Sequence, residues 1–310
     1  MKKILLPALL LFVLALAACG NKQEEPAKED TPAKEQGASD TITYESEEGP
    51  VEVPADPQRV VVLSSFAGTV HEFGVNLVGA ESWSKDNPSF DSFLKDVEEV
   101  SDENIEKIIE LEPDLIIGLN TIKNIDKLKE IAPTVTYTYG KVDYLTQQIE
   151  IGKLLNKEKE ATEWVDAFKA RAQQAGKDIK AKIGEDTTVS VIEEFDKQIY
   201  VFGDNWGRGT EILYQEMKLA MPEKVKEMTE KDGYYALSAE VLPEFAGDYV
   251  ILSKSDTGDN SFLETETYKN IPAVKNDQVY QVNTAEFSFN DAYTLDNQLD
   301  FFIKSFLGTK

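Results

Sequence analysis

The sequence predicts an α/β protein with two lobes joined by a long, rigid helix. On both sides of the chain's middle, short apolar β-branched runs alternate with segments of helical spacing, which is typical of sheets covered by helices. Between these regions, residues 144–182 carry helical spacing without a strand signal. A helix of about 26 residues starting near Asn156 would be about 40 Å long at 1.5 Å per residue, enough to span two lobes.

The first lobe is expected over residues 41–143 and opens with an alternating segment over 41–53 that ends at Pro54. A buried strand over 59–63 follows, because this stretch contains three successive valines. The later elements alternate in the same way: a helix over 66–73, a strand over 77–80, a helix over 105–111, a strand over 114–117, a helix over 124–131 and a strand over 134–137.

A helical linker is expected over 144–184, in which Asn156 should act as an N-cap that restarts the helix. The second lobe should occupy 185–310. Its expected elements are strands over 187–192 and 199–202, a helix from about Arg208, strands over 249–252 and 279–282, and a closing helix over 291–306.

The N-terminus has the pattern of a lipoprotein signal peptide over residues 1–18. Two lysines precede a short apolar run, and the only cysteine, Cys19, follows Leu-Ala-Ala where a cleavage site is expected. The run is shorter than the roughly 20 apolar residues that a membrane span needs. An ordinary cleaved signal with an incidental cysteine is the alternative. We expect Cys19 to be lipidated and residues 19–40, which are polar and charged, to be a disordered linker.

The charge and the scarcity of histidine exclude several functions. A formal net charge of -25 repels phosphate backbones, so no nucleic acid is expected as a partner. With His71 as the only histidine and Cys19 lipidated, side chains cannot build a site of imidazole or thiolate ligands for a transition metal. The sequence around His71 offers no G-x-S-x-G motif, so a lipid-anchored hydrolase using His71 with Asp or Glu is only an alternative.

A candidate binding loop spans residues 200–209 and follows a predicted strand. It places Tyr200, Trp206 and Arg208 among three glycines, which permit sharp turns and close approach of a ligand. No dinucleotide or P-loop motif is present. The indole face of Trp206 and the guanidinium of Arg208 suit an apolar ligand that carries oxygen acceptors. The alternative is structural: Trp206 would pack in the core and Arg208 would pair with an acidic residue. Further candidates just past strand ends are Phe66, Trp83, Tyr139, Phe287, Phe289 and Asn290.

Two glutamates occupy matching positions in the two lobes. Asn104 and Ser238 are expected N-caps, and Glu106 and Glu240 fall two residues later in the first helical turns. First-turn glutamates commonly stabilise helices through the dipole, which is the simpler explanation. Their matched placement suggests a paired role.

Several segments together resemble the FhuD-like ferric hydroxamate siderophore-binding lipoproteins of Gram-positive iron-uptake ABC transporters. They are the lipobox that ends at Cys19, residues 106–117, 132–135, the long central helix, 195–196 with 200–209, 246–249 and 290–296. The resemblance implies a class III periplasmic-binding-protein fold, in which a ligand sits between two lobes that close only slightly, and it implies no enzymatic activity. It also implies siderophore contacts from Arg208, Trp206, Tyr200 and Tyr139, so Arg208→Ala should weaken binding and leave the fold intact.

By the same resemblance, the protein captures ferric hydroxamate siderophores at the outer face of the cytoplasmic membrane and works as a monomer. Glu106 and Glu240 would meet arginines on two ABC permease subunits. Because three hydroxamates wrap the iron in a neutral, oxygen-rich sphere, no cofactor and no protein ligand to iron are needed. Haem or a multiply anionic catecholate siderophore remains the alternative ligand. Residues 286–289 depart from the family, having phenylalanines where a tryptophan or tyrosine is common.

Overall fold

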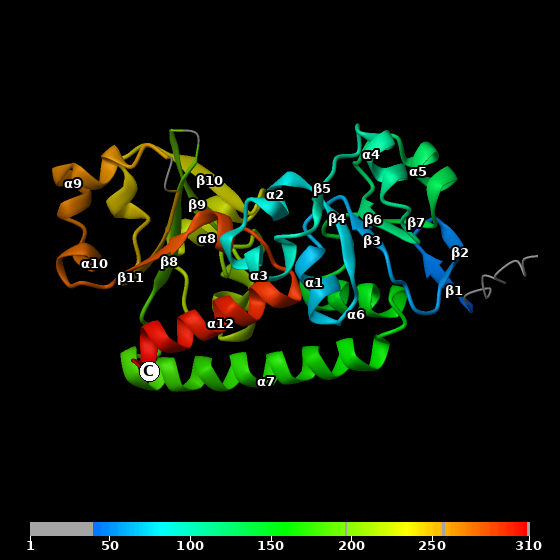
Figure 1. Ribbon diagram of the computed structural model, residues 1–310. Helices are drawn as coiled ribbons and strands as arrows, with labels where there is room; N and C mark the ends of the chain where they lie inside the picture. The colour runs from blue at the N-terminus through cyan, green and yellow to red at the C-terminus, as the bar shows by residue number, and fades with distance from the viewer. Residues whose placement is uncertain (1–39, 196, 256–257, 309–310) are drawn as a thin grey trace, which may run out of the picture. The chain divides into compact units, whose positions relative to one another are not determined.

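The computed structural model describes residues 40–195, 197–255 and 258–308. Within these ranges the chain forms two five-stranded sheets, a separate two-stranded hairpin, and helices that cover the sheets (Figure 1). A helix of 26 residues, α7 (Glu158–Ile183), connects the two α/β lobes. This arrangement confirms the predicted fold class.

The first sheet is parallel, with strand order β5-β4-β3-β6-β7. Its central strands are buried on both faces, since Val60 and Val62 join one core cluster while Val61 joins another. The elements of this lobe are β1 (Thr41–Ser46), β2 (Gly49–Pro54), β3 (Val60–Val62), α1 (Ala67–Glu72), β4 (Leu77–Ala80), α2 (Ser82–Lys85), the 3₁₀ helix η1 (Pro88–Phe90), α3 (Asp91–Leu94), β5 (Glu98–Glu99), α4 (Ile105–Glu110), β6 (Leu115–Leu119), α5 (Ile125–Ile131) and β7 (Thr134–Tyr137).

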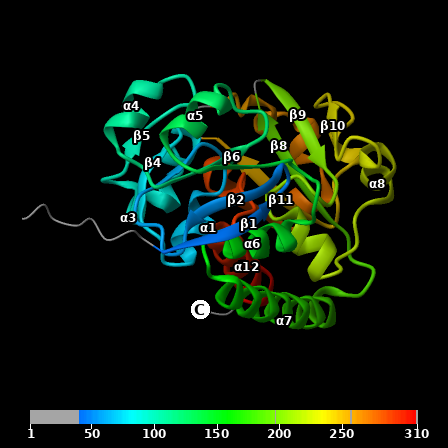
Figure 2. The ribbon, with the colours of Figure 1, turned by 90° about the vertical axis from the view of Figure 1, so that its right-hand side faces the viewer.

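The β1–β2 hairpin packs beside α6 (Tyr144–Leu154) in Figure 2. The Tyr44 hydroxyl on β1 lies 3.2 Å from the Tyr137 hydroxyl and donates to Glu150 of α6 at 3.3 Å. The alternating segment predicted over 41–53 therefore forms a hairpin that closes one side of the first lobe.

The second sheet has the order β10-β9-β8-β11-β12 and is mixed. Strands β8, β11 and β12 run parallel, whereas β9 is antiparallel to both β8 and β10. Its elements are β8 (Val189–Phe195), β9 (Gln198–Phe202), the π-helix η2 (Glu211–Glu216), α8 (Glu223–Thr229), β10 (Tyr234–Leu237), η3 (Leu242–Glu244), β11 (Tyr249–Lys254), η4 (Ser261–Glu264), α9 (Glu266–Lys269), α10 (Pro272–Lys275), β12 (Val279–Asn283) and α11 (Thr284–Phe287).

Two predicted helix starts are wrong. Asn156 does not cap α7: it adopts φ 56° just after α6 ends, and its side chain donates to the Ala55 carbonyl. Asparagine tolerates this left-handed conformation, so it stops one helix instead of starting the next. Ser238 opens no α-helix either, because its carbonyl accepts a turn hydrogen bond from Val241 and only the short η3 follows.

Three helices contribute to the cores of both lobes, and α6 does so with Ile151 in the first core and Leu145 in the second. Helix α7 places Ala161 in the core of the first lobe and Phe168 in the core of the second. The closing helix α12 (Ala292–Leu307) does the same with Ala292 and Leu299, and it lies alongside α7 in Figure 1. The lobes are therefore joined by three helices; the linker expected over 144–184 contains α6 and α7, whereas the sequence did not indicate that α12 joins both cores.

The N-terminus of α12 meets α1 at a buried polar junction. Asp291 is 2% exposed and caps α12, and its Oδ1 lies 1.8 Å from the position that a Cβ on Gly68 would occupy. Beside it, the Thr69 hydroxyl accepts from the backbone N–H of Ala292 at 3.2 Å and donates to Gln148 of α6 at 2.6 Å. Only glycine at position 68 permits this approach.

The junction should give stability a distinctive pH dependence. Burial raises the pKa of Asp291 from 3.8 to about 6, so the folded state holds this proton more tightly than the unfolded state. The contribution of Asp291 to stability is then greatest below about pH 4 and falls by about 2 to 3 kcal/mol as the pH rises through about 6.

We predict that Asp291→Asn removes this loss, so the variant gains stability relative to the unmodified protein between pH 4 and pH 7. Urea unfolding across this range measures the difference. Asp166→Asn on the exposed face of α7 is the matched control and should keep the original profile. Identical pH profiles for Asp291→Asn and the unmodified protein would contradict the assignment.

Candidate functional site

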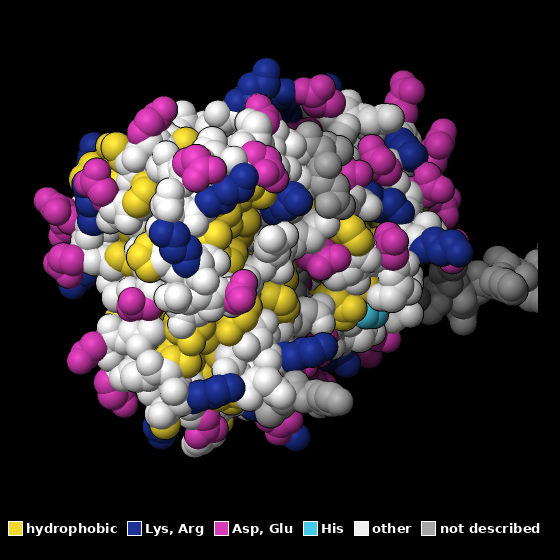
Figure 3. Space-filling model, turned by 90° about the vertical axis from the view of Figure 1, so that its left-hand side faces the viewer, with side chains coloured by type: hydrophobic (Ala, Val, Ile, Leu, Met, Phe, Trp, Pro, Cys, Tyr) yellow, Lys and Arg dark blue, Asp and Glu magenta, His cyan; other side chains and the backbone are white. Residues whose placement is uncertain are grey.

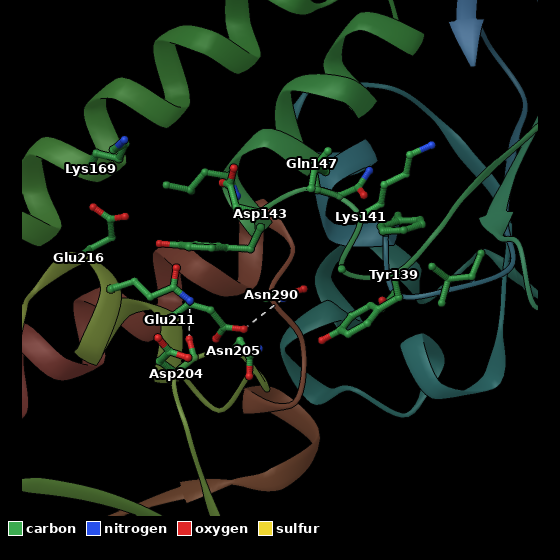
Figure 4. A pocket seen from close by; sticks show the side chains of 18 of the residues that line it. Tyr139, Lys141, Asp143, Gln147, Lys169, Asp204, Asn205, Glu211, Glu216 and Asn290 are labelled. Carbon is green, nitrogen blue, oxygen red and sulfur yellow. Dashed lines mark hydrogen bonds between the residues drawn. The ribbon is translucent and has the colours of Figure 1, made fainter. Parts of the chain in front are cut away.

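A cleft of about 680 Å³ opens between the two lobes (Figure 4). This volume is typical of small-molecule sites. The first lobe contributes residues that follow strands β3 and β7 and the last residue of β6, and the second contributes Asp204 and Asn205 after β9 together with residues of η2. Ligands of α/β proteins bind at such strand ends. The cleft is lined by Ser65, Phe66, Leu119, residues 139–145, Gln147, Lys169, Asp204, Asn205, Glu211, Gln215, Glu216, Lys218 and Asn290.

Three of the predicted ligand-binding residues line this cleft: Phe66, Tyr139 and Asn290. The Phe66 ring is 7% exposed and makes an edge contact with Tyr137, whereas Tyr139 is 57% exposed. Desolvation and the Glu211 carboxylate raise the pKa of Tyr139, while the nearby Arg208 opposes this shift. Tyr139 from the first lobe therefore faces charged groups of the second.

Arg208, in the candidate binding loop, makes a bidentate ion pair with Glu193 of β8. Its Nε and Nη2 donate to the Glu193 carboxylate at 2.9 and 2.6 Å, and its Nη1 donates to the Trp206 carbonyl at 3.0 Å. Its guanidinium also lies 4.8 Å from the centre of the Phe202 ring. Glu193 is 1% exposed, so Arg208 neutralises a buried charge. The expectation that Arg208→Ala leaves the fold intact is therefore not supported.

Tyr200 lies on β9 and Trp206 in the loop that follows it, and neither belongs to the described residues that line the cleft. The indole N–H of Trp206 donates to the Asp232 carbonyl at 2.9 Å, and its ring makes an edge contact with Tyr234 at 4.9 Å. Tyr200 packs against Phe202 and Tyr234. Both residues form an aromatic cluster next to the cleft.

The remaining aromatic candidates pack elsewhere. Phe289 is 2% exposed in the core of the first lobe, where it stacks on Phe90. Phe287 is 6% exposed in the core of the second lobe. Trp83 is 57% exposed and lies 5.4 Å from Phe289. These rings follow or flank strand ends as predicted, but burial in the cores turns both phenylalanines away from the cleft.

Several acidic residues that line the cleft were not indicated by the sequence. Glu211 is 2% exposed, and its carboxylate accepts from the Gly207 N–H at 3.0 Å, the Thr210 hydroxyl at 3.1 Å and the Asn290 amide at 3.3 Å. Burial raises its pKa. In the sequence Glu211 resembles any first-turn glutamate, whereas in the fold it connects the glycine-rich loop to Asn290, as Figure 4 shows.

Residues proposed for other roles lie outside the cleft. Glu106 is exposed in the first turn of α4 behind the Asn104 cap, and Glu240 is exposed in the turn before η3. His71 stacks on Phe93 at 3.9 Å, and burial lowers its pKa. Cys19, the signal peptide and the linker up to residue 39 lie outside the described residues.

Charged and hydrophobic side chains share the surface of the protein (Figure 3). On the face in Figure 3, acidic and basic side chains are interspersed, with hydrophobic patches between them. Across the described part of the chain, no group of three or more His, Cys, Asp or Glu side chains is placed to hold a metal ion. Among the described residues, no helix is both long enough and apolar enough to cross a membrane.

Two α/β lobes, a connecting helix and an interlobe cleft define a substrate-binding protein. Residues 60–285 match the periplasmic binding protein family, and the chain belongs to this family. It is therefore a binding protein and not an enzyme.

Similar proteins are known in sequence and structure. The chain is 37% identical over 303 residues to the iron(3+)-hydroxamate-binding protein FhuD of Bacillus subtilis (strain 168), covering 96% of this chain and 95% of that protein. A Bacillus subtilis structure described as a FhuD fold-family component of a Fep/Fec-like ferrichrome ABC transporter has a TM-score of 0.79 and 36% identity, covering 86% and 100% of the two chains. FhuD2 of Staphylococcus aureus with bound ferrioxamine B has a TM-score of 0.75 and 34% identity, covering 81% and 100%.

The Arg208–Glu193 pair yields a stability prediction. Arg208→Ala leaves the Glu193 carboxylate buried without its partner, so the free energy of unfolding should fall by about 3 to 5 kcal/mol. Adding Glu193→Gln removes the unpaired charge and should recover part of this loss. Urea unfolding of the single and double variants measures both effects.

Arg171→Ala is the control, because Arg171 pairs with Asp296 and Asp300 at 44% side-chain exposure. Its loss should cost no more than about 1 kcal/mol. If Arg208→Ala were as mild as Arg171→Ala, the pair would not have the structural role described.

Proposed function

We propose that this protein captures ferric hydroxamate siderophores in the interlobe cleft and delivers them to an ABC permease for iron uptake. The observation that carries the proposal is a cleft of about 680 Å³ formed by both lobes, in a chain that aligns over nearly its full length with a hydroxamate-binding relative. Phe66 and Tyr139 offer aromatic surface there, and the amides of Gln147, Asn205 and Asn290 offer hydrogen bonds.

Hydroxamate chemistry suits a site without a protein ligand to iron. Three hydroxamates complete the coordination of ferric iron, so no cofactor is needed and the protein has only to hold a neutral, oxygen-rich surface. Arg208 can contribute to this. A guanidinium has five N–H donors, and Glu193 and the Trp206 carbonyl occupy three of them, leaving two for ligand oxygens.

The charges in the cleft argue against the alternative ligands. Catecholate complexes are multiply anionic, yet the lining holds four carboxylates, Asp143, Asp204, Glu211 and Glu216, against the three lysines at 141, 169 and 218. Haem binding commonly uses a histidine ligand, and His71 does not belong to the residues found to line the cleft.

We further propose that the protein is held at the outer face of the cytoplasmic membrane by lipid on Cys19 and acts there as a monomer. The support is the Leu-Ala-Ala-Cys motif behind a charged and apolar N-terminus. Residues 19–40 would let the folded part reach the permease.

The ligand prediction compares three iron compounds. Titration with ferric desferrioxamine should quench tryptophan fluorescence and saturate, whereas haem and ferric enterobactin should bind far more weakly or not at all. Tyr139→Ala should weaken ferric desferrioxamine binding roughly tenfold, because it removes an exposed ring from the cleft wall. Thermal unfolding checks that this variant is folded. Preferential binding of haem or ferric enterobactin would overturn the assignment.

The docking prediction separates delivery from capture. We propose that exposed Glu106 and Glu240 meet basic residues on the two permease subunits, so Glu106→Arg with Glu240→Arg should abolish siderophore uptake by cells while purified protein keeps its affinity. Glu110→Arg with Glu227→Arg makes the same charge change at other exposed sites and should preserve uptake. The docking role would be excluded if the variant with Glu106→Arg and Glu240→Arg showed normal uptake. It would also be excluded if a loss of uptake were fully explained by weaker siderophore binding.

A further inference from the structure

One end of the cleft concentrates negative charge around a buried phenol. Tyr144 lines the cleft and is 9% exposed, and its hydroxyl faces the Glu216 carboxylate without completing a well-formed hydrogen bond to it. Burial raises the pKa of this phenol far above its ordinary value, and the charges of Glu216, Glu211 and Asp143 raise it further. We call Asp143, Tyr144, Glu211 and Glu216 the acidic end of the cleft.

The carboxylates at the acidic end lack cationic partners. No lysine or arginine nitrogen of the described chain lies within 4.0 Å of Asp143, Glu211 or Glu216. Glu216 accepts from the amide of Gln173 at 3.2 Å, and the Tyr144 hydroxyl approaches the same carboxylate. Figure 4 shows Lys169 on the same side of the cleft as Glu216, but the two are not paired. Glu216 is half-buried and so remains available to a ligand.

Asp143 and the deeper Glu211 differ in the direction of their pKa shifts. Burial opposes ionisation of Asp143, but hydrogen bonds from Thr146 and Leu145 lower its pKa overall. Burial instead raises the pKa of Glu211. Asp143 is exposed and Glu216 is half-buried, whereas Glu211 is only 2% exposed, so a ligand would contact the carboxylates of Asp143 and Glu216 first.

A ligand cation would satisfy this arrangement. A protonated amine against Glu216 would supply the missing positive charge and hold the carboxylate in place. The Tyr144 hydroxyl is enclosed beneath the surface of the cleft, so it would act on the ligand through Glu216, by donating to the carboxylate once that carboxylate is fixed. Tyr144 is in this sense a positioning residue.

We propose that the cleft selects ferric hydroxamate complexes that carry a protonated amine outside the iron centre, with Glu216 as the contact for that amine. This inference rests on the proposed function, because it names a subclass of the same ligands. The cleft would then distinguish two complexes that have the same iron centre and differ only in the charge of an amine far from the iron.

The test uses ferrioxamine B and its N-acetylated derivative, which have the same iron centre and differ in the charge of one amine. Followed by tryptophan fluorescence at low salt, the unmodified protein should bind ferrioxamine B about three- to tenfold more tightly than the acetylated complex. Added salt should reduce this ratio. Glu216→Gln should weaken binding of ferrioxamine B alone and bring the ratio close to one.

Two further variants complete the test. Tyr144→Phe should lower the ratio without changing affinity for the acetylated complex, which a purely structural role would not do. Glu227→Gln, an exposed charge on α8, should leave the ratio unchanged. Equal affinities for both complexes in the unmodified protein, or equal weakening of both by Glu216→Gln, would overturn this inference. Failure of both complexes to bind would instead overturn the proposed function.

Discussion

The close approach of α1 to the N-terminus of α12 is the constraint on which the cleft depends. Gly68 leaves room for the Asp291 cap, and Thr69 and Gln148 link the same point to α6 through short hydrogen bonds. Because α7 and α12 both enter the two cores, the lobes are joined at several places along their length. Asn290, which reaches the cleft, is the residue directly before the cap, so the junction also positions part of the site.

Charge is distributed unevenly around the cleft: an arginine already paired with a carboxylate lies next to it, and unpaired carboxylates line its acidic end. Arg208 is neutralised by Glu193 and retains spare donors, whereas the acidic end around Tyr144 holds carboxylates without cationic partners. Under the proposed function, the neutral part of a ligand would lie on the side of the cleft next to Arg208, and its periphery would meet the acidic end. The overall acidity of the chain, with a formal net charge of -25, would not reveal this division.

Periodicity predicted most of the fold because buried parallel strands such as β3 and β6 are continuous apolar runs. It failed where one residue type serves two local structures, as when Asn156 ends α6 in a left-handed conformation instead of capping α7. The site was less predictable. Phe287 and Phe289 follow strand ends as ligand-binding aromatics do, yet tertiary packing buries them. Glu211 and Tyr144 acquire their roles only when η2 is brought beside α6.

A crystal structure of the protein with a bound ferric hydroxamate would test the central claim most directly. The account predicts that the complex occupies the interlobe cleft against Phe66, Tyr139 and Asn290, with every iron ligand supplied by the siderophore. It would be contradicted if the complex bound outside this cleft, or if a protein side chain coordinated the iron.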